Sequence, residues 1–205
     1  MLRSIFHPAS QTTETKSTLI MLHGRGADEH DLFGLKERLD PRLDIHSLRA
    51  PFEYEWGGNA WFDMSEDGTL DEKSFLRSKA DILAFVDSIK ADNLFLLGFS
   101  MGAIMSYALA LTHPHLCRGI LALSGFAPLQ LEKEYRLNEL NDLHVFISHG
   151  INDPVIPVSA ARKTKELLSS SNAHVTYNEY HVAHQIAEEC LVDIGAWLKK
   201  LLDQP

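Results

Sequence analysis

The sequence predicts an α/β fold with a mainly parallel central sheet and helices on both faces. Short apolar runs typical of β-strands alternate along the chain with longer segments whose apolar residues recur at a helical period. Strands and helices that alternate in this way form right-handed crossovers between parallel strands, so helices cover both faces of the sheet. A chain of 205 residues also fits a single domain, residues 1–205, better than two.

The predicted strands are nearly continuous apolar runs, as is typical of strands that are buried on both faces. The clearest are residues 18–22, 93–98, 119–123 and 144–148. Weaker strands are predicted at residues 45–48 and 175–180, and the alternation of the second indicates a place near the sheet edge. Helices are predicted at residues 74–90, 102–113, 159–169 and 186–202.

A G-x-S-x-G motif lies where a predicted strand meets a predicted helix, at Gly98-Phe99-Ser100-Met101-Gly102. In the α/β-hydrolase fold, this motif forms a strained turn that lifts the serine hydroxyl above the sheet. Glycines are required because strand and helix approach too closely there for a side chain. The sequence therefore predicts the α/β-hydrolase fold with Ser100 as the nucleophile.

A serine nucleophile needs an acid and a histidine, which follow it along the chain in that order in this fold. Asp153 lies in the loop after residues 144–148, at the carboxyl end of a strand, where catalytic groups gather in parallel sheets. Asp142 precedes the same strand, and Asp193 falls inside the last helix. Asp153 is therefore the predicted acid.

The base is expected in the loop before the last predicted helix, which contains both His181 and His184. His184 immediately precedes the helix and is the predicted base. His181 directly follows the last strand, so we expect it to pack or to meet solvent.

Acyl transfer also needs backbone N–H groups that are placed in advance to stabilise an oxyanion. One is expected from Met101, the residue after the nucleophile. The other is expected from the glycine-rich loop at residues 22–28, which follows an early strand. We interpret His23 as a residue that fixes this loop.

The aromatic-rich segment at residues 51–71 does not fit the alternating pattern. A connection of this length in a compact domain is usually functional or packs as a loop of its own. Two interpretations remain open: its aromatic residues anchor the loop to the body, or they contact a ligand or the second subunit of a homodimer.

The composition argues against several functional classes. A formal net charge of −9 disfavours a nucleic-acid partner, and no apolar run is long enough for stable membrane insertion. The start of the chain lacks the pattern of a signal peptide, and Cys117 and Cys190 are too few for a disulfide framework, so a cytoplasmic protein is expected. Eleven histidines occur without a metal-binding motif, so neither a metal nor another cofactor is predicted.

The chain resembles the phospholipase/carboxylesterase family of small α/β-hydrolases, which includes bacterial carboxylesterases and acyl-protein thioesterases. The resemblance spans nearly the whole chain and rests on residues 22–28, 49–51, 60–63, 98–102, 149–153 and 184–186. It implies a Ser100–Asp153–His184 triad, oxyanion donors at the N–H groups of Arg25 and Met101, and no large cap domain. It also implies that the loop with Trp61 and Phe62 lines an acyl-binding groove.

Three positions depart from the family pattern: Arg25 stands where thioesterase-like members commonly have Leu, Met101 where they have Gln, and Ala183 where Gly is frequent. These departures favour a carboxylesterase that cleaves short to medium acyl esters of small molecules. Hydrolysis of lysophospholipids or thioesters is the alternative, and a catalytically silent binding module is a third. We expect the Arg25 side chain to point away from Ser100, toward the rim or a carboxylate such as Asp28.

Overall fold

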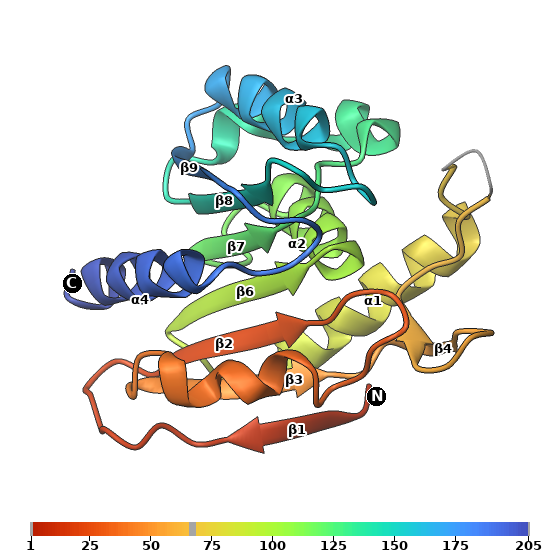
Figure 1. Cartoon of the computed structure of the whole chain (residues 1–205). Helices are drawn as coiled ribbons and strands as arrows, with labels where there is room; N and C mark the ends of the chain where they lie inside the picture. The colour runs from red at the N-terminus through yellow and green to blue at the C-terminus, as the bar shows by residue number, and fades with distance from the viewer. Residues whose placement is uncertain (1, 66–68, 205) are drawn as a thin grey trace.

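The computed structural model describes residues 2–65 and 69–204, and its main feature is a sheet of seven strands in the order β1-β3-β2-β6-β7-β8-β9 (Figure 1). These strands are β1 (Ser4–His7), β2 (Ser17–Leu22), β3 (Leu43–Leu48), β6 (Asn93–Phe99), β7 (Gly119–Leu123), β8 (His144–Gly150) and β9 (His174–Tyr180). A separate short hairpin consists of β4 (Phe52–Glu53) and β5 (Asn59–Ala60).

All neighbouring strands from β3 to β9 pair in parallel, and β9 lies at one edge. The predicted mainly parallel sheet is therefore confirmed. The other edge is β1, which pairs antiparallel with β3 and was not predicted. The four residues of β1 are all at least partly exposed and do not form a buried apolar run. Only the pairing with β3 therefore identifies this segment as a strand.

The four predicted helices are present, each with bounds within two residues of those expected. They are α1 (Glu72–Ser88), α2 (Met101–Thr112), α3 (Val158–Ser169) and α4 (Glu188–Leu202). Three 3-10 helices were not predicted: η1 (Leu32–Arg38), η2 (Leu129–Glu134) and η3 (Leu137–Glu139). Helix α1 begins at its N-cap Asp71, whose carboxylate accepts a hydrogen bond from the N–H of Ser74 at 2.8 Å.

The strands bury alternate side chains on opposite faces of the sheet. In β2, Ile20 and Leu22 belong to the core that contains α1 and α2, whereas Leu19 and Met21 belong to the core that contains η1 and α4. Figure 1 shows the helices on these two sides. Helix α2 is buried along nearly its whole length, as predicted from its uniformly apolar sequence. In the described part of the chain, no helix is both long and apolar enough to cross a bilayer.

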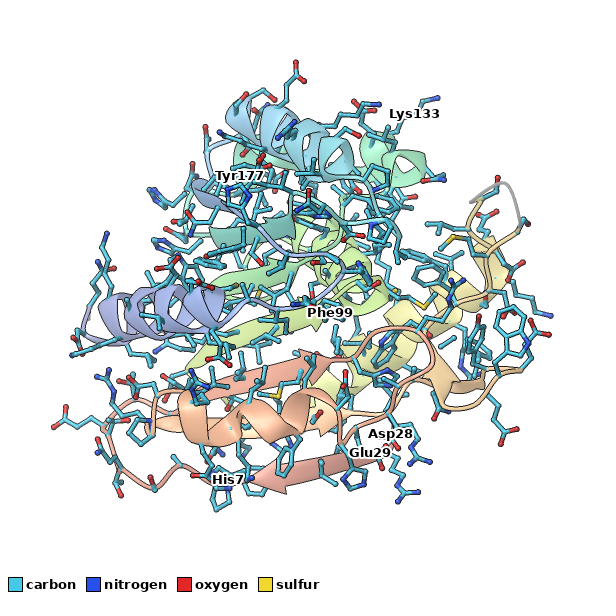
Figure 2. All side chains as sticks on the ribbon, in the orientation of Figure 1. His7, Asp28, Glu29, Phe99, Lys133 and Tyr177 are labelled. Carbon is cyan, nitrogen blue, oxygen red and sulfur yellow. The ribbon has the colours of Figure 1, made fainter. Side chains whose placement is uncertain are left out.

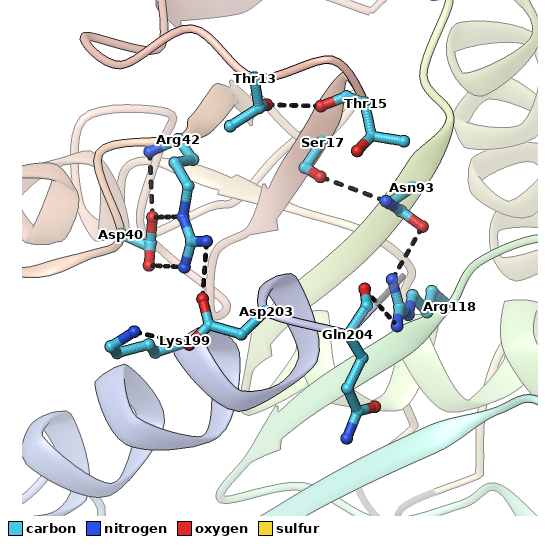
Figure 3. Close-up of polar contacts among 10 residues, drawn as sticks. All are labelled: Thr13, Thr15, Ser17, Asp40, Arg42, Asn93, Arg118, Lys199, Asp203 and Gln204. Atoms are coloured by element: carbon cyan, nitrogen blue, oxygen red, sulfur yellow. Dashed lines mark hydrogen bonds and ion pairs between the residues drawn. The ribbon is translucent and has the colours of Figure 1, made fainter.

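The amino ends of the parallel strands are held by polar contacts near the end of α4 (Figure 3). Arg42 binds both carboxylate oxygens of Asp40 and one oxygen of Asp203, each at 2.8 Å. Nearby, Arg118 donates to the side-chain oxygen of Asn93 at 3.2 Å. These contacts tie the end of α4 to the sheet, while the opposite, carboxyl ends of the strands carry the candidate site.

Candidate active site

Ser100 lies in a strained turn between β6 and α2. Its φ of 53° and ψ of −114° are uncommon for a residue with a side chain. The turn depends on its glycines, because a Cβ on Gly102 would lie 1.9 Å from the carbonyl oxygen of Leu22, and one on Gly98 would lie 2.3 Å from the carbonyl oxygen of Gly102. Ser100 therefore sits at the carboxyl end of the central strand, as the motif predicts.

The structure brings Ser100, His184 and Asp153 together. The Nε2 of His184 lies 2.9 Å from the Oγ of Ser100, and the Nδ1 of the same ring lies 2.7 Å from the Oδ2 of Asp153. Because a carboxylate only accepts hydrogen bonds, Nδ1 carries the proton and Nε2 presents its lone pair to the serine hydroxyl. Figure 2 shows Phe99 at the end of β6, and its ring centroid lies 4.9 Å from that of His184.

Asp153 is held as a carboxylate although its side chain is buried. Burial by itself would raise its pKa, but hydrogen bonds from His184 and from the N–H groups of Ile156 and Val155 outweigh burial, and the pKa falls below its ordinary value. Both backbone N–H groups donate to Oδ1, at 2.8 Å from Val155 and 2.9 Å from Ile156. Oδ2 is thereby left free to face His184.

A second histidine contacts the same carboxylate and was not identified from the sequence. The side chain of His149 is fully buried; its Nε2 lies 2.7 Å from the carbonyl oxygen of Ile156 and 3.3 Å from Oδ2 of Asp153. A carbonyl only accepts, so Nε2 carries the proton and donates it to Ile156, while Oδ2 of Asp153 lies close to the same nitrogen. The four-residue spacing of His149 and Asp153 was the available sequence clue.

The rejected candidates lie elsewhere. The side chain of Asp142 is 87% exposed, and its nearest charged partner is His115 at 4.0 Å. Asp193 accepts a hydrogen bond from the hydroxyl of Tyr180 at 2.7 Å, and His181 is exposed. None of these side chains contacts Ser100 among the described residues.

Two backbone N–H groups are free beside the nucleophile. Across the described residues, neither Arg25 nor Met101 donates a backbone hydrogen bond to another part of the protein. Met101 is the first residue of α2, where the helix dipole favours negative charge. The loop that contains Arg25 is fixed by Gly26, which has a φ of +81° and donates its N–H to the carbonyl of Asn59 at 2.9 Å.

His23 fixes the start of this loop. The N–H of Ala50 donates to its Nε2 at 3.1 Å, so Nδ1 carries the proton and donates to the carbonyl of Gly24 at 2.7 Å. Burial lowers the pKa of His23, which keeps the ring neutral and preserves this arrangement. These contacts agree with the structural role that we expected of His23.

The structure places Trp61 and Phe62, the expected substrate-binding residues, in the core, although Phe62 also lines a hollow that Arg25 borders. Their side chains are 0% and 1% exposed, because the segment folds back against α2 and places them in the core. The indole N–H of Trp61 donates to the carbonyl of His23 at 2.9 Å, and its backbone N–H donates to Sδ of Met101 at 3.3 Å. Trp61 thus supports the loops around Ser100, and Met64 is the residue of this segment that reaches the neighbouring cavity. Residues 66–68 of the aromatic segment lie outside the described residues.

A cavity of about 280 Å³ opens beside Ser100. Apart from Ser100 and Arg25 its walls are apolar, formed by Met64, Met101, Ile104, Phe126, Val155, Ile156, Pro157 and Ala160. Phe126, Pro157 and Ala160 also line a second cavity of about 550 Å³ between η2 and α3. The two cavities therefore share apolar wall residues.

A hollow of about 750 Å³ lies at the other end of the sheet. It is lined in part by Asn93, Arg118 and Gln204, which are hydrogen-bonded to one another in Figure 3. These three polar groups are thus used in contacts within the protein, and Ser100 does not line this hollow, so we place the site at the smaller cavity. Across the described residues, no group of three or more His, Cys, Asp or Glu side chains is arranged to hold a metal ion.

Comparison with known proteins agrees with this geometry. A family model described as Phospholipase/Carboxylesterase matches residues 5–202. The chain belongs to this family. It is 31% identical to acyl-protein thioesterase 1 of Saccharomyces cerevisiae, with 95% of this chain and 96% of that protein aligned. The crystal structure of the Bacillus cereus carboxylesterase superposes with a TM-score of 0.87 at 25% identity, over 98% of this chain and 94% of the other.

The crystal structure of Zea mays acyl-protein thioesterase 2 has the same fold, with a TM-score of 0.83 at 23% identity, over 98% of this chain and 99% of the other. The predicted family and the predicted α/β-hydrolase fold without a large cap are confirmed. The predicted class of enzyme, a hydrolase that acts on esters, is confirmed with the family.

Proposed function

We propose that this protein is a serine carboxylesterase that cleaves short to medium acyl esters through Ser100, His184 and Asp153. The observation that carries the proposal is the continuous hydrogen-bonded chain from the Oγ of Ser100 through His184 to Asp153. An unprotonated Nε2 beside a serine hydroxyl in a strained turn is the arrangement that an activated nucleophile needs.

The first half-reaction forms an acyl-enzyme. The Oγ of Ser100 attacks the ester carbonyl carbon as Nε2 of His184 takes the hydroxyl proton. The carbonyl π electrons move onto oxygen, which the N–H groups of Arg25 and Met101 stabilise. The C–O bond to the alcohol then breaks, and His184 returns its proton to the departing alkoxide.

The second half-reaction hydrolyses the acyl-enzyme. Water loses a proton to His184 and attacks the same carbonyl carbon, and the proton is then given to Oγ of Ser100 as the acid leaves. Throughout, Asp153 stays ionised and holds the imidazole with Nδ1 protonated, which agrees with the low pKa of this carboxylate.

The proposal is tested with Ser100→Ala, His184→Ala and the double variant on 4-nitrophenyl butyrate. We expect each single variant to lose nearly all turnover, leaving about 10³–10⁴-fold over water, and the double variant to be little worse. A fluorophosphonate probe should label wild type at Ser100. Losses that multiply in the double variant, or a His181→Ala variant that is more damaging than His184→Ala, would contradict the assigned roles.

The alternative substrate is a longer acyl ester or thioester. It is favoured by the apolar lining of the cavity at Ser100, which shares Phe126, Pro157 and Ala160 with the larger cavity between η2 and α3, and by the similarity to the yeast acyl-protein thioesterase. A series of 4-nitrophenyl esters from acetate to palmitate, with matched thioesters, distinguishes the two. A silent binding module would leave Ser100 unlabelled and every ester intact.

Two further features of the proposal concern the setting of the enzyme. We place it in the cytoplasm because both cysteines, Cys117 and Cys190, are buried free thiols; immunodetection after cell fractionation tests this.

We also propose a homodimer through the aromatic hairpin, where Trp56 is 81% exposed. Sedimentation velocity of wild type and Trp56→Ser tests this association. Neither a nucleic-acid partner nor a metal cofactor forms part of the proposal.

A further inference from the structure

Arg25 is an unpaired cation at the candidate active site. Within the described part of the chain, every other arginine has a hydrogen bond or an ion pair with a protein group, and Arg25 has neither. Asp28, the expected partner, instead lies 3.4 Å from Arg49, and Figure 2 shows it beside Glu29. The guanidinium of Arg25 is therefore not neutralised by a neighbouring carboxylate.

The side chain of Arg25 is nevertheless held in place. Its Cζ lies 5.4 Å from the ring centroid of Tyr54, within the range of a cation–π interaction. Tyr54 is itself fixed through its backbone, because its N–H donates to the carbonyl of Gly58 at 3.0 Å. An arginine stacked on an aromatic ring is partly ordered before it binds, which lowers the entropy lost on contact with a ligand.

The cavity beside Ser100 combines two polar lining residues with apolar walls. Arg25 is the sole charged side chain among its described lining residues. The other walls are apolar, and three of their residues, Phe126, Pro157 and Ala160, also line the second cavity. An acyl chain is suited to these apolar walls, which leaves the alcohol portion of a bound ester to face Arg25.

Acidic residues lie on the outer side of Arg25. Glu53, Glu55 and Asp63 line a neighbouring hollow that shares Arg25 and Met64 with the cavity at Ser100. In the described residues, none of these carboxylates comes within ion-pair distance of Arg25, and all three are exposed, so solvent screens them. They therefore do not neutralise Arg25, which stays available to an anionic ligand in the cavity that it shares with Ser100.

We propose that Arg25 selects esters that carry an anionic group, a carboxylate or a phosphate, on the alcohol portion. This inference rests on the proposed esterase function. The guanidinium donates up to two parallel hydrogen bonds to the anionic group while its own backbone N–H serves the oxyanion. Arg25 is thus a specificity residue in addition to a backbone donor.

The test compares two butyrate esters that differ in one charge: the ester of 4-hydroxybenzoate and the ester of methyl 4-hydroxybenzoate. The measured quantity is the ratio of their kcat/KM values in wild type and in Arg25→Met. In this ratio, any effect of the substitution on the oxyanion loop cancels, because both esters share the same acyl group. We expect Arg25→Met to lower the ratio about 10-fold, with Arg25→Lys between the two.

Two controls separate binding by Arg25 from a general charge effect. Arg77→Met on α1 changes the net charge by the same amount. Among the described residues, Arg77 pairs with Asp81 alone and lines neither cavity, so this variant should keep the wild-type ratio of kcat/KM values. In 1 M salt, where charges are screened beyond about 3 Å, the ratio should fall in wild type and much less in Arg25→Met. A ratio that is equal in wild type and Arg25→Met would overturn the inference.

The position and kind of anion are tested with further probes. The butyrate ester of 4-hydroxyphenyl phosphate, compared with the benzoate ester, shows whether phosphate or carboxylate is preferred. An Arg25-dependent preference for mono-4-nitrophenyl glutarate over 4-nitrophenyl butyrate would overturn the assignment to the alcohol side. Absence of Ser100 labelling and of neutral-ester hydrolysis would refute the proposed function itself, whereas an intact esterase with an unchanged ratio would refute only this inference.

Discussion

Trp61→Phe separates a supporting role of Trp61 from a substrate-binding one. The substitution keeps an aromatic ring in the core but removes the indole N–H, so the buried carbonyl of His23 loses its donor at 2.9 Å. An unsatisfied buried acceptor costs about 1–3 kcal/mol, and the smaller ring leaves a void that costs about 1 kcal/mol more. We therefore expect the free energy of unfolding to fall by about 2–4 kcal/mol.

For a protein of this size, that loss corresponds to a decrease in Tm of about 5–15 °C, measurable by differential scanning calorimetry and urea unfolding. Because His23 begins the loop that contains Arg25, kcat/KM should also fall, by the same factor for acetate and for decanoate esters. The reasoning would be refuted by a variant with unchanged Tm and a selective loss on long esters. That result would restore Trp61 to the acyl groove.

Three other outcomes are expected. His149→Leu removes the buried N–H that donates to the carbonyl of Ile156 and lies 3.3 Å from Oδ2 of Asp153, so the loop that holds the acid loosens and kcat should fall about 10-fold. His149→Gln, which retains a donor, should recover most of this loss; equal kcat values for the two variants would contradict a role of the donor. The lowered pKa of His23 stabilises the fold above about pH 6.5, and this contribution is lost as pH falls toward the folded-state pKa. His23→Gln should therefore show a shallower fall of unfolding free energy between pH 7 and 5, and an unaltered slope would exclude this linkage. Dialysis against a strong chelator should leave the esterase rate unchanged, whereas a loss restored by zinc would indicate a metal site.

The order of strands and helices was largely predictable because each depends on a local pattern. Apolar runs buried on both faces identify the parallel strands, and the apolar period identifies the four helices. The edge strand β1 and the 3-10 helices escaped prediction. They are short and partly exposed, so they depend on a neighbouring strand or loop more than on their own residues.

The sequence by itself determined the strand–turn–helix at Ser100, where glycine is needed for steric reasons, and the chain order that nominated Asp153 and His184. Only the tertiary structure decided which faces the connecting segments present. It buried Trp61 against His23, 38 positions away, brought His149 close to Asp153, and left Arg25 without a carboxylate partner among the described residues. Such contacts follow from the packing of segments that are distant along the chain, and a local pattern of residue types does not specify the partner across the fold.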